Sequence, residues 1–196
     1  MSGINTGRAR AVVNIDADGR LADFIITAYT HPEFAREVAD SLRAWSYEPA
    51  REHGKPVGTR VELGFLFEAR GMVVALNHVD AFNAATNRLF ENGAKATSAT
   101  CNASELDRPL TAVEIVRPQH PGKLVQPAAA EGTVTLDFYV DADGKPRMPV
   151  VISTSNEVFA LAAVDALSKW KFTPPTSDGR PVAVRVRQDF IFRVGS

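Results

Sequence analysis

Two matching stretches of sequence decide the fold. Residues 7–19 read Gly-Arg-Ala-Arg-Ala-Val-Val-Asn-Ile-Asp-Ala-Asp-Gly, and residues 132–144 read Gly-Thr-Val-Thr-Leu-Asp-Phe-Tyr-Val-Asp-Ala-Asp-Gly. In both stretches apolar side chains recur at every second position, which predicts a β-strand with one buried face. The Asp-Ala-Asp-Gly that follows predicts a hairpin turn, because aspartate accepts local backbone hydrogen bonds and glycine adopts positive φ.

These stretches belong to a longer internal repeat with an offset of 125 residues. Residues 7–67 align with residues 132–192 without a gap, and 18 of the 61 aligned positions are identical. Chance would give about three or four identities at average composition. The sequence therefore contains a duplicated domain.

Each copy predicts the same elements after its hairpin turn. A second strand is expected at 21–28 and 147–153, a helix next, and a last strand at 59–68 and 184–193. The helix cap candidates are Thr30, His31, Ser155 and Asn156. Apolar residues recur at helical spacing at Phe34, Val38, Leu42 and Trp45, and at Phe159, Ala163, Leu167 and Trp170.

The repeat predicts an α+β protein with two β-β-α-β domains, each a three-stranded antiparallel sheet packed on one helix. We expect domain 1 at residues 1–69, a connector at 70–107 with a helix near 80–92, and domain 2 at 108–196. Within these ranges, Met72–Leu76 could extend the preceding strand, and Thr111–Val116 could form an extra strand.

Composition excludes several classes of function. The 196 residues carry 22 Lys and Arg against 23 Asp and Glu, which removes the electrostatic basis for nucleic-acid binding. The single cysteine, Cys101, rules out an internal disulfide and reads as an incidental thiol. No stretch is long and apolar enough to span a membrane, and Met1–Arg10 has no apolar segment typical of a signal peptide.

The sequence carries no motif for catalysis or for cofactor binding, so we expect no enzymatic activity, no cofactor and no bound metal. The Asp-x-Asp-Gly turns invite comparison with a calcium loop. That loop needs glycine at its sixth position and a closing acid at its twelfth, and neither is present. A hairpin turn is the better interpretation of both sequences.

The helix and its exit resemble a known family. Phe34-Ala-Arg-Glu-Val-Ala-Asp-Ser-Leu-Arg-Ala-Trp-Ser-Tyr-Glu-Pro49 is similar to the TonB C-terminal domain, and residues 166–174, Ala-Leu-Ser-Lys-Trp-Lys-Phe-Thr-Pro, match it more loosely. Gly132-Thr-Val-Thr-Leu, Val140-Asp-Ala-Asp-Gly144 and Gly179-Arg-Pro-Val182 also fit the family pattern. The resemblance covers both copies and leaves the middle of the chain unexplained.

The resemblance implies a periplasmic module that binds a segment of an outer-membrane receptor by adding it as a strand to the edge of the last strand. The edge residues so implied are Val184, Arg185, Val186, Arg187, Gln188 and Phe190 in the second copy, and Arg60, Glu62 and Gly64 in the first. The family's Gln-Pro-x-Tyr-Pro segment, which helps hold the peptide, corresponds to Arg117-Pro118-Gln119-His120-Pro121. Arginine and histidine thus replace its glutamine and tyrosine.

Two hypotheses about function follow. In the first, the protein is a periplasmic binding module that captures a protein or extended peptide by strand addition, such as an outer-membrane receptor segment. Val186→Pro should then remove an edge donor and weaken binding more than folding. In the second, the module is structural, and its copies pair with each other or in a homodimer without a peptide ligand.

Three further expectations accompany these hypotheses. The copies could pair edge to edge into one sheet of six strands, since the closure entropy of the connector grows only slowly with length. The outward residues Arg185, Arg187 and Asp189 could instead be charges that discourage aggregation of an exposed edge. A native signal or anchor is expected to be missing from this sequence.

Overall fold

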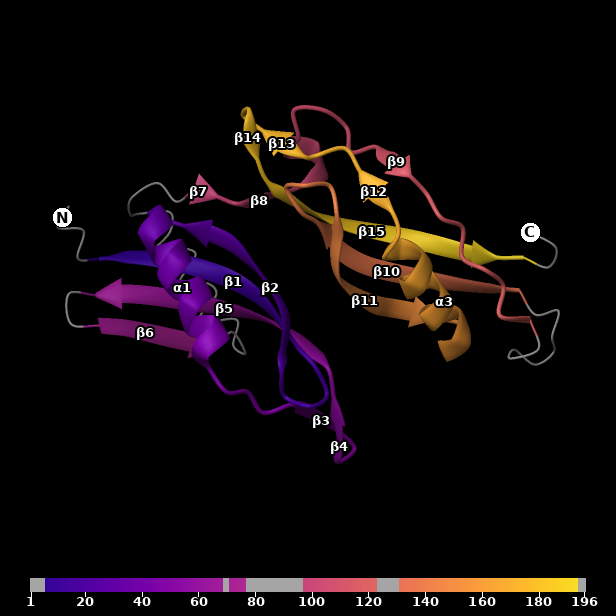
Figure 1. Ribbon diagram of the computed structural model, residues 1–196, viewed down its shortest axis with the longest axis horizontal. Helices are drawn as coiled ribbons and strands as arrows, with labels where there is room; N and C mark the ends of the chain where they lie inside the picture. The colour runs from indigo at the N-terminus through magenta and orange to yellow at the C-terminus, as the bar shows by residue number, and fades with distance from the viewer. Residues whose placement is uncertain (1–5, 69–70, 77–96, 123–130, 194–196) are drawn as a thin grey trace. The chain divides into compact units, whose positions relative to one another are not determined.

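The computed structural model describes residues 6–68, 71–76, 97–122 and 131–193 (Figure 1). The chain divides into two compact units, Met1–Ala99 and Thr100–Ser196. This division falls inside the segment 70–107 that the sequence predicts to be a connector. The helix predicted near residues 80–92 lies outside the described residues.

The elements of the first unit are β1 (Gly7–Ile15), β2 (Leu21–Tyr29), α1 (Pro32–Ala44), β3 (Ala50–Glu52), β4 (Lys55–Val57), β5 (Thr59–Glu68), β6 (Gly71–Leu76) and β7 (Thr97–Ser98). Its sheet has the order β6-β5-β1-β2-β7, and β3 and β4 form a separate small hairpin. Helix α1 lies across one face of the sheet (Figure 1).

The elements of the second unit are β8 (Thr100–Cys101), a 3-10 turn (Ala103–Glu105), β9 (Ala112–Glu114), β10 (Gly132–Val140), β11 (Pro146–Thr154), α3 (Glu157–Leu167), β12 (Lys171–Phe172), β13 (Thr176–Ser177), β14 (Arg180–Pro181) and β15 (Ala183–Phe192). The main sheet has the order β11-β10-β15-β8, and the pairs β12-β9 and β13-β14 are separate. Strand β9 confirms the extra strand predicted within 111–116.

The predicted α+β fold is confirmed, and the two copies share one register. In the first unit β1 pairs with β5 from Gly7 opposite Phe67 to Ile15 opposite Thr59 without a shift. In the second unit β10 pairs with β15 from Gly132 opposite Phe192 to Val140 opposite Val184, again without a shift. The sheets are wider than the three strands predicted, because β6 and β7 join the first sheet and β8 joins the second.

One expectation about strand pairing is wrong. Residues 72–76 do not extend β5, because the chain reverses and β6 pairs antiparallel with it. In the described part of the chain, β5 and β15 belong to two different sheets, one in each unit.

The Asp-x-Asp-Gly sequences form the hairpin turns that the sequence predicts. Asp141 Oδ1 accepts hydrogen bonds from the backbone N–H of Asp143 at 3.0 Å and of Lys145 at 2.9 Å. Gly144 follows with φ of 80°. A Cβ atom at Gly144 would also overlap the carbonyl oxygen of Phe172, whose N–H donates to the Gly144 carbonyl at 2.9 Å. The turn therefore needs glycine both for its backbone angle and for close packing against the chain that leaves α3.

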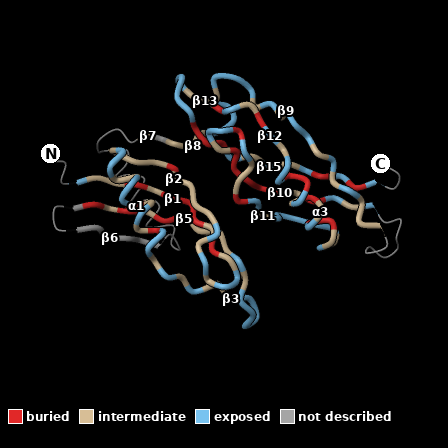
Figure 2. The backbone as a smooth tube through the Cα atoms, in the orientation of Figure 1, coloured by how far each residue is buried: buried red, intermediate tan, exposed pale blue. Residues whose placement is uncertain are grey.

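Each unit has its own core between the sheet and its helix, and buried residues concentrate on the central strands (Figure 2). The first core consists of Ala9, Ala11, Val13, Ile15, Val38, Leu42, Leu63, Phe65 and Phe67. The second consists of Val134, Leu136, Phe138, Val140, Phe159, Ala160, Ala163, Leu167, Phe172, Val184, Phe190 and Phe192. The apolar alternation of the first and last strands thus predicted the buried face correctly.

The tryptophans lie beyond the helices rather than on them. Trp45 is the C-terminal cap of α1, and Trp170 follows the end of α3. Both are partly buried against the cores. The indole N–H of Trp170 donates to the carbonyl oxygen of Val116 at 2.8 Å, so this side chain also holds the segment that precedes β10.

A glycine beneath a phenylalanine ring joins each helix to its sheet. The Phe159 ring packs on Phe192 with ring centroids 4.6 Å apart, and Phe34 packs on Phe67 at 4.4 Å. A Cβ atom at Gly132 would overlap the Phe159 ring, as one at Gly7 would overlap Phe34. The first strand must therefore present glycine at this position.

We predict that Gly132→Ala lowers the free energy of unfolding of the second unit by about 1–3 kcal/mol, because the new methyl group displaces the Phe159 ring. Urea unfolding followed by the amide signals of residues in the second unit measures the change, since tryptophan fluorescence would report Trp45 and Trp170 together. Adding Phe159→Leu to Gly132→Ala should cost less than the sum of the two single changes. Strict additivity would show that the ring and the glycine are not coupled.

Candidate functional site

The backbone N–H and C=O groups of successive β15 residues point alternately toward β10 and toward the other side of the strand. The carbonyl oxygen of Thr133 accepts from the N–H of Ser155 at 3.1 Å, and the Thr133 N–H donates to Ser155 Oγ at 3.2 Å. The polar backbone groups of Thr133 therefore face β11. Backbone N–H and C=O groups point to alternate sides along a strand, so the groups of Gly132 and Val134 face β15. Gly132 lies opposite Phe192, and Val134 lies opposite Phe190.

The same alternation runs through the unbroken register of the pair. Backbone groups that face β10 belong to Val184, Val186, Gln188, Phe190 and Phe192. Those that face the opposite edge belong to Arg185, Arg187, Asp189 and Ile191. The sequence predicts six β15 residues as a peptide-binding edge. Of these six, only Arg185 and Arg187 have N–H and C=O groups that point outward. Asp189 and Ile191 also point outward, and the prediction omitted them.

Strand β8 covers only the beginning of this edge. It pairs in parallel with Ala183 and Val184, opposite Thr100 and Cys101. Past Val184, β15 has no second strand partner among the described residues. We call the stretch Arg185–Ile191 on this side the β15 edge.

The corresponding edge in the first unit is largely occupied. Strand β6 pairs with β5 from Leu63, opposite Leu76, to Glu68, opposite Gly71. This pairing removes Gly64 from the candidate edge, because Gly64 lies opposite Ala75. Arg60 and Glu62 lie before the first paired residue of β6.

The other outer strand of the second unit, β11, is irregular. Its pairing with β10 shifts register twice, between Thr135 and Leu136 and between Asp137 and Tyr139. Met148 adopts a positive φ of 54°, and Pro149, which has no N–H to donate, follows it. Bulges and proline are features that protect exposed strand edges from pairing. The β15 edge has neither.

A buried carboxylate lies beside the β15 edge. Asp137 points to the sheet face that α3 does not cover, yet its side chain is only 3% exposed. Arg185 Nε donates to both of its carboxylate oxygens, at 2.9 and 3.0 Å. Arg187 lies farther away, with its guanidinium nitrogen 3.8 Å from Asp137 Oδ2. One buried negative charge thus orients Arg185 and attracts Arg187.

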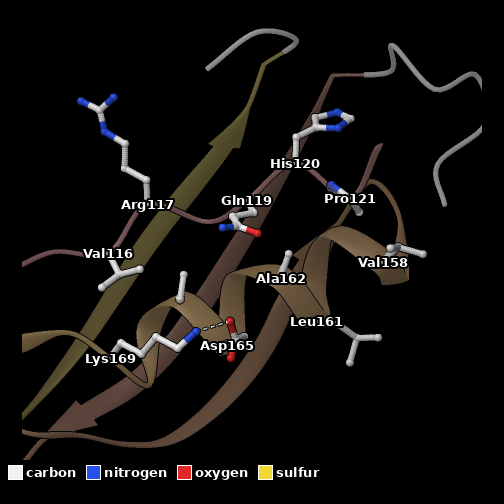
Figure 3. A pocket seen from close by; sticks show the side chains of 11 residues that line it. Val116, Arg117, Gln119, His120, Pro121, Val158, Leu161, Ala162, Asp165 and Lys169 are labelled. Carbon is white, nitrogen blue, oxygen red and sulfur yellow. Dashed lines mark hydrogen bonds and ion pairs between the residues drawn. The ribbon is translucent and has the colours of Figure 1, made fainter. Parts of the chain in front are cut away.

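The predicted pre-strand segment, residues 117–121, lies along α3 rather than along the β15 edge. The segment and α3 enclose a hollow of about 440 Å³. Figure 3 shows Gln119 between the segment and the helix, whereas Arg117 points away from the helix. The ring of His120 packs edge-on against Phe159 with centroids 5.4 Å apart, and its Nδ1 accepts from the N–H of Gly122 at 3.0 Å. This histidine is therefore fixed by packing and by a hydrogen bond.

The helix side of this hollow differs from the matching face of α1. Val158, Leu161 and Ala162 line the hollow, and Leu161 is 72% exposed. The aligned positions in α1 are Glu33, Arg36 and Glu37. The two copies thus share a core, but this helix surface is charged in the first copy and apolar in the second.

A second hollow, of about 330 Å³, lies at the far end of β15. It is lined by Arg117, Pro118, Ile191 and Arg193. The pre-strand segment therefore reaches the C-terminal end of β15 through Arg117 and Pro118. Strand β8 marks one end of the β15 edge, and this hollow marks the other.

Residues before β9 secure the beginning of β15. Asp107 accepts from the backbone N–H groups of Asp178 at 2.9 Å and Gly179 at 3.0 Å, and these bonds fix the turn between β13 and β14. The bond from Gly179, with smaller contributions from Thr176 and Asp178, lowers the pKa of Asp107. In β8, burial raises the pKa of the Cys101 thiol, and Glu105 and Asp107 add to the effect. A thiol with a raised pKa is a poor nucleophile, which agrees with a structural role for Cys101.

Neither a metal site nor a membrane span is found in the described part of the chain. No group of three or more His, Cys, Asp or Glu side chains there could hold a metal ion. None of the described helices has the length and apolar character needed to cross a bilayer.

Comparison with known proteins agrees with the duplicated architecture. The model of the family described as the Gram-negative bacterial TonB protein C-terminal matches residues 4–69 and 113–194, one segment in each copy. The chain belongs to this family. The predicted resemblance to tandem TonB C-terminal domains is therefore confirmed.

Two TonB proteins illustrate the relationship. Protein TonB of Vibrio cholerae is 30% identical over 90 residues, which cover 45% of this chain and 36% of that protein. The chain thus spans about a third of the length of this curated relative. The solution NMR structure of the Pseudomonas aeruginosa TonB C-terminal domain matches with a TM-score of 0.39 and 24% identity, over 50% of this chain and 94% of that one.

We predict that Asp137→Asn lowers the free energy of unfolding of the second TonB C-terminal domain by about 1–3 kcal/mol, because Arg185 loses its buried counter-charge. Asp40→Asn is the matched control, since Asp40 and Arg43 form an exposed pair on α1 and should contribute less than about 0.5 kcal/mol. Equal effects of the two substitutions in chemical denaturation would show that burial of Asp137 adds nothing.

Proposed function

We propose that the protein is a periplasmic protein-interaction module of the TonB type, and that it captures an extended segment of its partner by strand addition to the β15 edge. The observation that carries the proposal is the regular outward run of backbone groups at Arg187, Asp189 and Ile191, beyond the end of β8. A regular row of outward donors and acceptors along a strand edge is a template for another strand.

The comparison of strand edges supports this choice. In the first unit β6 occupies most of the matching edge of β5, and β7 pairs with part of the opposite edge strand, β2. In the second unit β11 carries two register shifts and two prolines. The β15 edge combines an unbroken register, the absence of proline and the lack of a strand partner in the described residues past Val184.

The relatives suggest where the module acts. A TonB protein of a Gram-negative bacterium is the curated relative, and the family is the C-terminal part of such proteins. We therefore place the module in the periplasm, with a segment of an outer-membrane receptor as the candidate partner. Transfer of energy to that receptor belongs to the proposal, and it requires an anchor in the cytoplasmic membrane.

The first unit favours a second, structural role. Its sheet carries additional strands of its own chain at both outer positions, β6 and β7. We therefore assign peptide capture to the second unit alone. The first unit serves as a spacer or an assembly domain.

The alternation of β15 also gives a sharper test than Val186→Pro. The N–H of Val186 faces β10, so proline there would break the central pairing and unfold the domain. Arg187→Pro removes an outward N–H instead, and proline is tolerated where the N–H of an edge strand faces solvent. Arg187→Gln is the matched control, because it removes the same charge and keeps the N–H.

We predict that Arg187→Pro weakens binding of a short blocked peptide of alternating threonine and valine by about tenfold or more, since it removes a main-chain hydrogen bond and obstructs the added strand. Arg187→Gln should bind this uncharged peptide like the unaltered protein. Peptide titrations followed by amide chemical shifts measure both, and the amide spectra report whether each variant is folded. Equal binding by a folded Arg187→Pro variant would exclude the β15 edge.

A further inference from the structure

We propose that the β15 edge selects an extended segment with acidic side chains at alternate positions. The inference rests on the proposed strand addition and adds the chemistry of the segment. It follows from the arginines that flank the edge, from their positions on one face of the sheet, and from the way the two copies of the domain differ there.

The arginines are held on the sheet face that α3 leaves uncovered. Side chains of Arg185, Arg187, Asp189 and Ile191 share this face, because they alternate with the buried residues of β15. Arg185 is 56% exposed and Arg187 is 63% exposed, although both lie near the Asp137 carboxylate. Asp137 on β10 fixes the orientation of Arg185, and both arginines keep more than half of their side-chain surface exposed.

Positive charge also gathers at the far end of the edge. Arg117 and Arg193 both line the hollow that Pro118 and Ile191 complete. With Arg185 and Arg187, this makes four arginines along β15. Asp189 is the one acidic residue of that strand. Asp189 is engaged by the Thr135 hydroxyl, which donates to its Oδ1 at 2.7 Å. Even with Asp137 counted, positive charge is in excess.

The duplication provides an internal control for this pattern. Arg187 aligns with Glu62, and Arg193 aligns with Glu68, so two acidic positions of the first copy are arginines in the second. Glu68 lies in the stretch of β5 that β6 covers, Glu62 lies just before that stretch, and the residue aligned with Arg185 is arginine in both copies. Glutamate and arginine are both charged, so protection of a strand edge against self-pairing does not by itself explain why the sign of the charge changes.

An added strand would bring its own side chains next to these arginines. Side chains directly opposite on one sheet face lie about 4.5–5.5 Å apart at their Cβ atoms. Since alternate residues of a strand share a face, Arg185 and Arg187 would lie beside two residues separated by one position. Acidic residues there complement both arginines, and each opposite-charge pair favours binding by about two- to fivefold.

Three short blocked peptides of equal length test the inference. The first alternates threonine and valine, the second carries glutamate at two adjacent threonine positions, and the third carries lysine there. We expect the glutamate peptide to bind the full chain about five- to twentyfold more tightly than the uncharged peptide at low salt, and the lysine peptide to bind more weakly. The preference should shrink as salt rises, because exposed charges are screened.

Variants assign the preference to the arginines. Arg187→Gln and Arg117→Gln should each reduce the glutamate preference, the ratio of the affinities for the glutamate and the uncharged peptide, by about two- to fivefold. Arg36→Gln is the matched control, because Arg36 is an exposed arginine on α1 of the other unit and should change nothing. Amide spectra of each variant show that it is folded, and Arg117 lies outside the strands, so its substitution spares the sheet.

The outcomes separate this inference from the proposal beneath it. Equal binding of all three peptides would overturn charge selection and leave strand addition intact. A glutamate preference that Arg36→Gln reduces as much as Arg187→Gln does would also overturn it, since the effect would then reflect net charge. Failure of all three peptides to bind would overturn both.

Discussion

The packing of one phenylalanine ring over one glycine fixes the geometry on which each unit depends. Phe159 lies above Gly132 at the start of β10 and packs on Phe192 at the end of β15, so a single ring joins helix, first strand and last strand. Phe34, Gly7 and Phe67 repeat the arrangement. Burying such a side chain contributes about 1.5–3 kcal/mol, and the absent Cβ makes that burial possible. The unbroken register of β10 with β15 is consistent with this fixed end.

Around this shared core, the two copies diverge at surfaces. The identical positions include the turn Asp-Ala-Asp-Gly, the Phe and Gly of the ring contact and the Trp after each helix. The differences concern the last strand's edge, which β6 covers in one copy, and the helix face, which is charged in one copy and apolar in the other. After duplication, packing restrains the core, while an exposed edge or face can take on a new role. The two copies thus share their packing and differ in their exposed surfaces.

The sequence predicts the elements well because their periodicity is local, but it predicts edges poorly because an edge depends on pairing. The apolar run 72–76 indicates a strand without showing that it folds back onto β5. Likewise, the edge assignment of Val186 required knowing that Thr133 bonds to Ser155, which fixes the direction of every backbone group along β15. Asp137 reads as an outward polar residue in an alternating strand. Its burial becomes visible only when the register places Arg185 and Arg187 around it.

The energetics of strand addition explain why side chains at the β15 edge matter. Each net main-chain hydrogen bond contributes about 0.5–1.5 kcal/mol, whereas ordering each residue of a flexible peptide costs about 1–2 kcal/mol. Main-chain pairing along a stretch as short as Arg185–Ile191 therefore does little more than offset the ordering of the segment it binds. In the proposed complex, affinity and selectivity would therefore come from side chains, through charges beside Arg185 and Arg187 and through contacts in the hollow near Arg117. An edge of this kind favours a partner that is recognised by its side-chain pattern and is readily released.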